Sequence, residues 1–166
     1  MRKGTGSHIM SDFSPLDPRR IPVAVVGANG YAGEQLMRVL LRHPNVHLVA
    51  LTSRAETGRR LTEVMPRFRH WPGADALNVM PPDIGRITSS GAKVAFLALP
   101  HGVAAEFAVP LVAQGLRVID LSADFRLEHP AVYEEYYEQP HPAPGLLQEA
   151  VYGLPEIHAE RIRTAL

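Results

Sequence analysis

The sequence predicts a doubly wound α/β domain, in which helices cover both faces of a mostly parallel β-sheet. Four short runs have the near-continuous hydrophobicity of strands that are buried on both faces. Amphipathic segments alternate with these runs, which is the order that a parallel sheet requires. A glycine-rich turn joins the first apolar run to the first amphipathic segment.

The first strand, helix and second strand are expected within about thirty residues, the size of a βαβ unit. Ile21–Val26 is a continuous apolar run that predicts a buried strand. Tyr31–His43 places Met37 and its leucines on one face, which predicts a helix that ends before Pro44. Val46–Thr52 repeats the buried-strand pattern.

The middle of the chain gives a weaker pattern. Four prolines divide Arg54–Arg86 into irregular pieces, and only Arg60–Val64 is expected to form a short helix there. Lys93–Leu99 and Leu116–Leu121 are the third and fourth predicted core strands.

An amphipathic helix is predicted between the third and fourth strands, over Val103–Val112. Pro110 lies inside this segment, so we expect the helix either to kink there or to restart with the proline in its first turn. Gly115 fits the left-handed position that often closes a helix.

The first twenty residues are expected to contribute nothing to the fold. Residues 1–10, MRKGTGSHIM, resemble the remnant of an expression vector, which removes His8 from the candidate ligands. Residues 11–20 combine prolines and charges without periodicity and predict a flexible lead-in. Residues 21–166 are expected to form one nucleotide-binding domain.

Two more helices are expected near the carboxyl end. Ala131–Tyr137 predicts a short one. The other begins at Pro155 and reaches Leu166 without a closing glycine, asparagine or proline, so we expect the chain to be part of a longer protein.

Composition limits the classes of partner. Of 166 residues, 46% are hydrophobic, which favours one globular domain. Seventeen basic residues balance seventeen acidic ones, so the net charge favours binding to neither nucleic acid nor an anionic membrane. Cysteine is absent, which excludes disulfides and a thiol nucleophile within these residues. No apolar run approaches the ~20 residues that span a bilayer. We expect a cytoplasmic protein with small-molecule partners.

The strongest local signal is GANGYAG, which lies between the first strand and the first helix and includes Asn29 and Tyr31. In a Rossmann-like fold, Gly27 would allow the tight turn and Gly33 would let the helix pack close to the strand. Gly30 would let the backbone approach a pyrophosphate, and a β-branched residue there would resist a positive φ. The alternative is an ordinary strand-to-helix turn.

The end of the second strand indicates the type of cofactor. NAD enzymes usually place an acidic residue there to bind the ribose 2′-hydroxyl. This chain has Ser53 and Arg54, a hydroxyl and a guanidinium that suit a 2′-phosphate. The pattern therefore favours NADP, and the alternative is that Arg54 is a solvated loop arginine.

Two further turns follow core strands on the same side of the predicted sheet. Leu99–Gly102 follows the third strand, and Ser122–Arg126 follows the fourth. Pro100 and His101 are candidates to flank the nicotinamide ribose. A lone histidine is more often a local hydrogen-bonding or capping residue than a catalytic base.

Other charged groups support no further site. Asp124 and Arg126 are candidates for an ion pair that shapes their loop. The eight histidines show no HxH or HExxH spacing, so no metal site is predicted.

Several ordered segments together resemble one family, the N-acetyl-gamma-glutamyl-phosphate reductases of arginine biosynthesis. The resemblance extends from Ile21 to Leu166. It rests on GANGYAG, LRHP at Leu41–Pro44, FLALPHGVA at Phe96–Ala104, VIDLSADFRL at Val118–Leu127 and AVYGLPE at Ala150–Glu156.

The resemblance implies an enzyme that reduces an acyl phosphate to an aldehyde with NADPH. Family members use a cysteine thiolate to form a thioester and a histidine to handle protons. Both catalytic residues are expected beyond the end of this chain, followed by a substrate and oligomerisation domain, so no catalytic residue is assigned here. The parent enzyme is expected to be a homo-oligomer, and this chain alone is expected to be inactive.

Three other classes of protein share some of these features. Aspartate-semialdehyde dehydrogenase shares the glycine loop and the thioester chemistry, but SADFR and VYGLPE speak against it. A short-chain dehydrogenase needs a tyrosine four residues before a lysine, and neither Lys3 nor Lys93 has one. A non-catalytic NADP-binding module is the remaining alternative.

Overall fold

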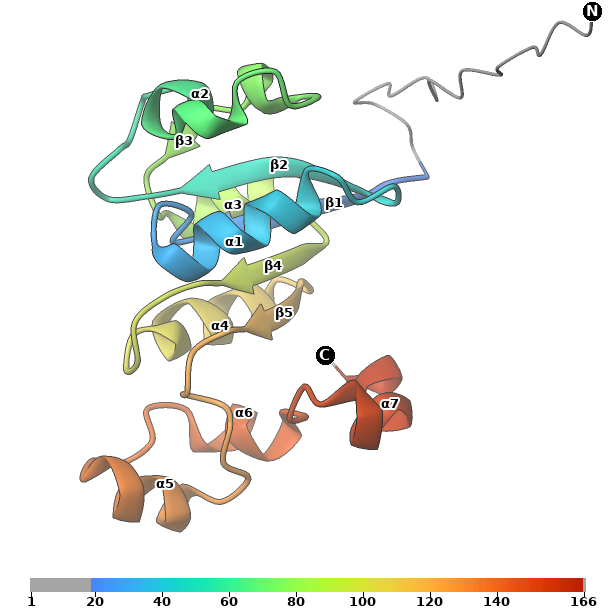
Figure 1. Cartoon of the computed structure of the whole chain (residues 1–166). Helices are drawn as coiled ribbons and strands as arrows, with labels where there is room; N and C mark the ends of the chain where they lie inside the picture. The colour runs from blue at the N-terminus through green and yellow to red at the C-terminus, as the bar shows by residue number, and fades with distance from the viewer. Residues whose placement is uncertain (1–18, 166) are drawn as a thin grey trace, which may run out of the picture.

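The computed structural model describes residues 19–165. The expected vector remnant at 1–10, most of the lead-in at 11–20, and Leu166 lie outside the described residues. The chain forms a five-stranded sheet in the order β3-β2-β1-β4-β5, and every pair of neighbouring strands is parallel (Figure 1). The strands are β1 (Ile21–Val26), β2 (Val46–Thr52), β3 (Val79–Met80), β4 (Val94–Leu97) and β5 (Arg117–Asp120).

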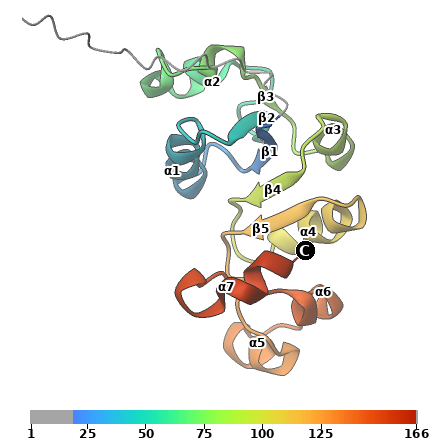
Figure 2. The same cartoon turned by 90° about the vertical axis from the view of Figure 1, so that its right-hand side faces the viewer.

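Helices cover both faces of this sheet, as predicted. Figure 2 shows α1 on one side of the strands and α3 and α4 on the other. The α-helices are α1 (Tyr31–Leu40), α2 (Leu61–Val64), α3 (Ile84–Ser89), α4 (Ala104–Ala113), α5 (Pro130–Tyr137), α6 (Pro144–Glu149) and α7 (Pro155–Thr164). Two short 3₁₀ turns, η1 (Pro66–Phe68) and η2 (Ala74–Ala76), lie between α2 and β3.

Each face of β1 belongs to a different hydrophobic core. Val23 and Val25 pack in one core with Met37 of α1. Ala24 and Val26 pack in the other with residues of α3 and α4. Because alternate residues of a strand point to opposite faces, burial on both faces explains the uninterrupted apolar run.

The predicted elements of the first βαβ unit are confirmed, with one difference in length. β1 and β2 have the predicted bounds, whereas α1 ends at Leu40 instead of His43. Leu41 is the C-cap, and the amide of His43 closes a tight turn onto the carbonyl of Leu40 at 3.1 Å. β4 and β5 are also one or two residues shorter at each end than predicted.

The region predicted to be largely irregular contains a strand and a helix that the sequence pattern missed. β3 has only two residues, and these pair with Leu51 and Thr52 of β2. Asp83 then caps α3 by accepting a hydrogen bond from the amide of Arg86 at 2.8 Å. The expected short helix at Arg60–Val64 is present as α2.

α4 is a single helix that continues through Pro110, so the expected restart at the proline is wrong. Proline has no N–H to donate to the carbonyl of Glu106, and Glu106 lies on the exposed side of the helix, where water can bind that carbonyl. Gly115 closes the helix with φ +80°, as predicted, and its amide donates to the carbonyl of Val112 at 2.8 Å.

The remaining helices, α5 to α7, lie beyond the β5 edge of the sheet (Figure 1). α5 confirms the helix expected at Ala131–Tyr137, α6 was not predicted, and α7 begins at Pro155 as expected. Among residues 19–165, no helix is long and apolar enough to cross a lipid bilayer.

Candidate functional site

The strand order changes direction between β1 and β4, because the chain moves outward from β1 to β3 and then returns to β4 on the other side of β1. In open α/β sheets, ligands bind at such a point, outside the carboxyl ends of the strands. The glycine loop follows β1 at this end of the sheet, and the Leu99–Gly102 turn follows β4.

Two of the three loop glycines are required by close backbone contacts. Gly27 has φ +86°, and a Cβ atom there would lie 2.4 Å from the carbonyl oxygen of Ala98. A Cβ on Gly33 would lie 2.4 Å from the carbonyl oxygen of Gly27 and 2.9 Å from the Cα of Ala28. The predicted roles of Gly27 in the turn and of Gly33 in helix packing agree with this geometry.

Gly30 differs from the other two glycines because close backbone contacts do not require it. The expected positive φ at this position is wrong. Its φ is −74°, so the backbone there does not need the positive φ that a β-branched residue would resist. A Cβ would meet the carbonyl oxygens of Gly27 and Ala98 at 3.5 and 3.8 Å, which is ordinary contact. A longer side chain would therefore project into the space between the ends of β1 and β4.

The amino end of α1 offers amide groups to this space. The first bond within the helix runs from the amide of Glu34 to the carbonyl of Gly30, at 2.9 Å. The amides of the residues between them precede this bond, so they have no acceptor within the helix. Asn29 and Tyr31 are both exposed beside these amides, and Tyr31 is 85% exposed. Such an end of a helix favours an anion.

Replacing Gly30 tests whether a ligand occupies this space. We expect Gly30→Val to raise the Kd for NADPH about 5–150-fold, because overpacking against a bound pyrophosphate costs about 1–3 kcal/mol. The free energy of unfolding should fall by only about 1 kcal/mol, since the position has no steric conflict in the free protein. Isothermal titration with NADPH and urea unfolding measure the two effects. Gly30→Ala is the graded control and should have a smaller effect on the Kd for NADPH. An unchanged NADPH affinity in folded Gly30→Val would show that the ligand lies elsewhere.

Thr52 holds the glycine loop in place, a role that the sequence pattern did not predict. Its carbonyl accepts hydrogen bonds from the amides of Gly27 and Ala28 at 3.2 and 2.9 Å. Its hydroxyl is a further acceptor for Gly27 at 3.4 Å, and the residue is fully buried. The sequence offered one signal for this role, a polar residue at the end of a buried and mostly apolar strand.

The two residues after Thr52 have separate environments. Ser53 is 3% exposed, and its carbonyl accepts a hydrogen bond from the hydroxyl of Thr57 at 2.7 Å. Its own hydroxyl accepts from the amide of Glu56 at 3.4 Å, so Ser53 shapes the turn. Arg54 is exposed to solvent, and Glu56 is paired with Arg59 at 2.5 Å.

The turn after β4 is joined to the loop after β5 through Asp124. This carboxylate is fully buried and lies 2.7 Å from Nδ1 of His101. It also accepts hydrogen bonds from the amides of Gly102 and Ala104 at 2.7 and 3.0 Å. Among the described residues, Asp124 therefore contacts the imidazole of His101 and forms no ion pair with Arg126, which corrects one of the predicted alternatives. Pro100, the other candidate in this turn, is exposed.

His101 has the local hydrogen-bonding role that its position suggested. Its side chain is 35% exposed and packs against Tyr137, with ring centroids 4.2 Å apart. Nε2 lies 3.5 Å from the hydroxyl of Tyr133, at the outer limit of a hydrogen bond. Burial raises the pKa of the Tyr133 hydroxyl, and the charge of Asp124 raises this pKa further.

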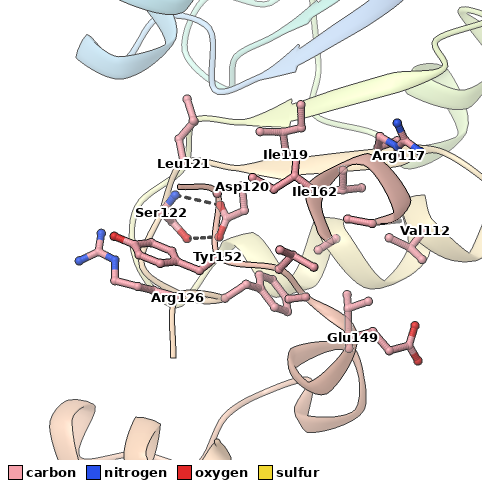
Figure 3. Close-up of a pocket in the computed structure, with 18 of the residues that line it drawn as sticks. Val112, Arg117, Ile119, Asp120, Leu121, Ser122, Arg126, Glu149, Tyr152 and Ile162 are labelled. Carbon is pink, nitrogen blue, oxygen red and sulfur yellow. Dashed lines mark hydrogen bonds between the residues drawn. The ribbon is translucent and has the colours of Figure 1, made fainter. Parts of the chain in front are cut away.

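A cavity of about 570 Å³ lies between β5, α4 and the last part of the chain (Figure 3). Ser122 donates its hydroxyl to the carboxyl of Asp120 at 2.7 Å. Burial raises the pKa of Asp120, and the hydrogen bonds from Ser122 offset part of that rise. Arg126 and Tyr152 line the same cavity. Within residues 19–165, no three His, Asp or Glu side chains are grouped as a metal site would require.

The sequence matches a family model described as the NAD binding domain of semialdehyde dehydrogenase over residues 22–165. The chain belongs to this family. A nicotinamide dinucleotide is therefore the cofactor class of this semialdehyde dehydrogenase domain. In folds of this kind, the dinucleotide binds at the switch point, the position at which the glycine loop lies here.

Several relatives carry the name N-acetyl-gamma-glutamyl-phosphate reductase. The protein of Akkermansia muciniphila is 58% identical over 147 residues, which cover 89% of this chain and 42% of that protein. The protein of Nitrosococcus oceani is 48% identical over 145 residues, which cover 87% of this chain and 41% of that protein. The chain thus spans about two fifths of the length of these relatives.

A solved structure supports the fold. The aspartate semialdehyde dehydrogenase of Candida albicans, solved with NADP, aligns with a TM-score of 0.56 over 67% of this chain and 32% of that protein. The sequences are 21% identical, so this likeness concerns the fold alone.

Proposed function

We propose that this semialdehyde dehydrogenase domain is the NADP-binding part of an N-acetyl-gamma-glutamyl-phosphate reductase. The observation that carries the proposal is the 58% identity to the Akkermansia muciniphila protein of that name, which extends over nearly the whole described chain. The reaction would reduce N-acetyl-gamma-glutamyl phosphate to N-acetylglutamate semialdehyde. The aspartate-semialdehyde dehydrogenase alternative is supported by the shared glycine loop and by a likeness of fold at 21% identity.

The residues at the switch point fit a dinucleotide. The space above Gly30 is bounded by the carbonyls of Gly27 and Ala98, and a side chain longer than Cβ at Gly30 would enter it. The first amides of α1 border the same space and suit the pyrophosphate. When bound, the cofactor supplies the hydride. The chain's own residues bind it and fix its orientation.

NADP is favoured over NAD by the charge at the end of β2. Arg54 is exposed and lies directly after the buried Ser53, where NAD enzymes usually carry an acidic residue. Glu56, the nearest acid along the chain, is paired with Arg59. The turn therefore offers a cation and no unpaired acid to a 2′-phosphate.

The remaining parts of the proposal concern the whole protein. The 166 residues contain no cysteine, so the thiolate that forms the thioester would come from another part of the protein. As the family resemblance implies, we propose that the whole protein is a cytoplasmic homo-oligomer whose small-molecule partners are NADPH and the acyl phosphate.

Charge reversal at Arg54 tests the cofactor assignment. We expect Arg54→Glu to raise the Kd for NADPH about 10–100-fold, because a charge-assisted contact worth about 1.5–3 kcal/mol is replaced by repulsion. The Kd for NADH should change much less. Titration of both nucleotides by isothermal calorimetry measures the difference.

Arg163→Glu is the matched control for Arg54→Glu. Arg163 lies on α7, beyond the opposite edge of the sheet, and its side chain is 71% exposed. Arg163→Glu should leave the affinities for NADPH and NADH unchanged. An equal loss of NADPH and NADH affinity in Arg54→Glu would contradict the 2′-phosphate assignment.

A further inference from the structure

We infer that Asp124 and His101 form a positioning pair, which holds the Pro100–Gly102 turn against the nicotinamide end of the bound dinucleotide. This inference rests on the proposed function. It concerns two side chains that lie 23 positions apart in the chain and belong to the loops after β4 and β5.

One buried carboxylate organises the whole turn. Asp124 Oδ1 accepts from the amide of Gly102 and lies 2.7 Å from Nδ1 of His101, while Oδ2 accepts from the amide of Ala104. α4 begins after Val103, which provides no side-chain cap, so Asp124 caps the helix from a distant loop. Gly102 has φ +82°, a conformation that this cap helps to maintain.

The backbone around Asp124 is fixed as well. Its amide donates to the hydroxyl of Ser122 at 3.1 Å, and its carbonyl is bonded to Nε2 of His141 at 2.8 Å. Ser122 in turn donates to Asp120 at the end of β5. The carboxylate is therefore held from both sides, and it transmits this rigidity to the turn after β4.

The position of the turn determines which end of the cofactor it can touch. The residue after β4 lies directly against the glycine loop, because a Cβ on Gly27 would meet the carbonyl oxygen of Ala98 at 2.4 Å. The adenosine end is expected on the other side of the loop, at the end of β2, where Arg54 lies. With the pyrophosphate on α1, the nicotinamide end must extend toward the ends of β4 and β5.

The imidazole of His101 completes the arrangement. Nδ1 lies 2.7 Å from Oδ1 of Asp124, and Nε2 lies 3.5 Å from the hydroxyl of Tyr133. Tyr137 packs on the ring, with centroids 4.2 Å apart. The ring is thus oriented by α5 and by Asp124 together, yet about a third of the side chain remains exposed.

Comparison of two ligands separates positioning from general stability. NADPH has both ends of the dinucleotide, whereas 2′,5′-ADP has only the adenosine end with its 2′-phosphate. We expect Asp124→Asn and His101→Phe each to raise the Kd for NADPH about tenfold, because a turn that is no longer held in place must be ordered when the ligand binds. The Kd for 2′,5′-ADP should be unchanged in both variants.

The two variants also protect the test against misfolding. Asp124→Asn keeps the size of the side chain but replaces one carboxylate oxygen by an NH₂ group, which cannot accept hydrogen bonds from the turn. His101→Phe keeps the ring that packs on Tyr137, and His101 is partly exposed, so this variant should fold even where Asp124→Asn does not. Because the two residues act as a pair, the double variant should lose no more affinity than Asp124→Asn alone. His129→Phe, at an exposed histidine before α5, is the matched control and should bind both ligands normally.

The possible outcomes distinguish this inference from the proposed function. An equal loss of affinity for NADPH and 2′,5′-ADP would show that the pair only stabilises the fold and would overturn the inference. Unchanged NADPH affinity in folded His101→Phe would overturn it as well. A wild-type chain that binds neither ligand would refute the proposed function itself, and the inference with it.

Discussion

Gly27→Ala is expected to lower the free energy of unfolding by about 2–5 kcal/mol. Two costs combine at this position. A non-glycine residue at φ +86° costs about 1–2 kcal/mol. The new Cβ would also lie 2.4 Å from the carbonyl oxygen of Ala98, and moving that backbone apart costs about 1–3 kcal/mol more. Urea unfolding followed by circular dichroism measures the change.

Two other glycines separate these costs. Gly58 has φ +87°, and a Cβ added there would meet nothing within 4 Å, so Gly58→Ala carries the strain of the backbone without a clash. Gly33 has no positive φ, but its Cβ would lie 2.4 Å from the carbonyl oxygen of Gly27, so Gly33→Ala carries the clash alone. Gly27→Ala should be more destabilising than either. Equal effects in Gly27→Ala and Gly58→Ala would mean that the backbone at Ala98 moves away from the new methyl group at no cost.

Burial on both faces made most of the sheet predictable. β1 and β2 are buried on both faces along most of their length, so their sequences are mostly apolar, with His47 and Thr52 as the polar residues of β2, and their bounds follow from the pattern. β3 has two residues and is followed by Pro81 and Pro82, which leaves no periodicity to detect. Its pairing with β2 depends on tertiary contacts that a local pattern does not encode.

The candidate site was predictable where it depends on one continuous segment. GANGYAG specifies a turn and a helix start within seven residues, and the structure places both there. The contact between Asp124 and His101 joins two loops that are distant in sequence, so the sequence could offer only alternatives for each residue. Thr52 was missed because its contribution comes mainly from its backbone carbonyl, which every residue has.

We expect the 166 residues by themselves to show no reduction of N-acetyl-gamma-glutamyl phosphate by NADPH above the blank, even where they bind NADPH. The proposed reaction requires a thioester, and a thioester requires a thiolate that a sequence without cysteine does not contain. Oxidation of NADPH, followed by its absorbance, measures turnover. The Akkermansia muciniphila relative serves as the positive control in the same assay.

Ser122 and His101 are poor substitutes for a thiolate. The hydroxyl of Ser122 donates to Asp120 at 2.7 Å, and a carboxylate is far too weak a base to produce an alkoxide, even though burial raises the pKa of Asp120. His101 is bound to Asp124 through Nδ1, and Tyr133 and Tyr137 pack around its ring. Turnover by a preparation whose intact mass matches these 166 residues would contradict the thioester mechanism. If Ser122→Ala then abolished that turnover, the hydroxyl would be the nucleophile instead.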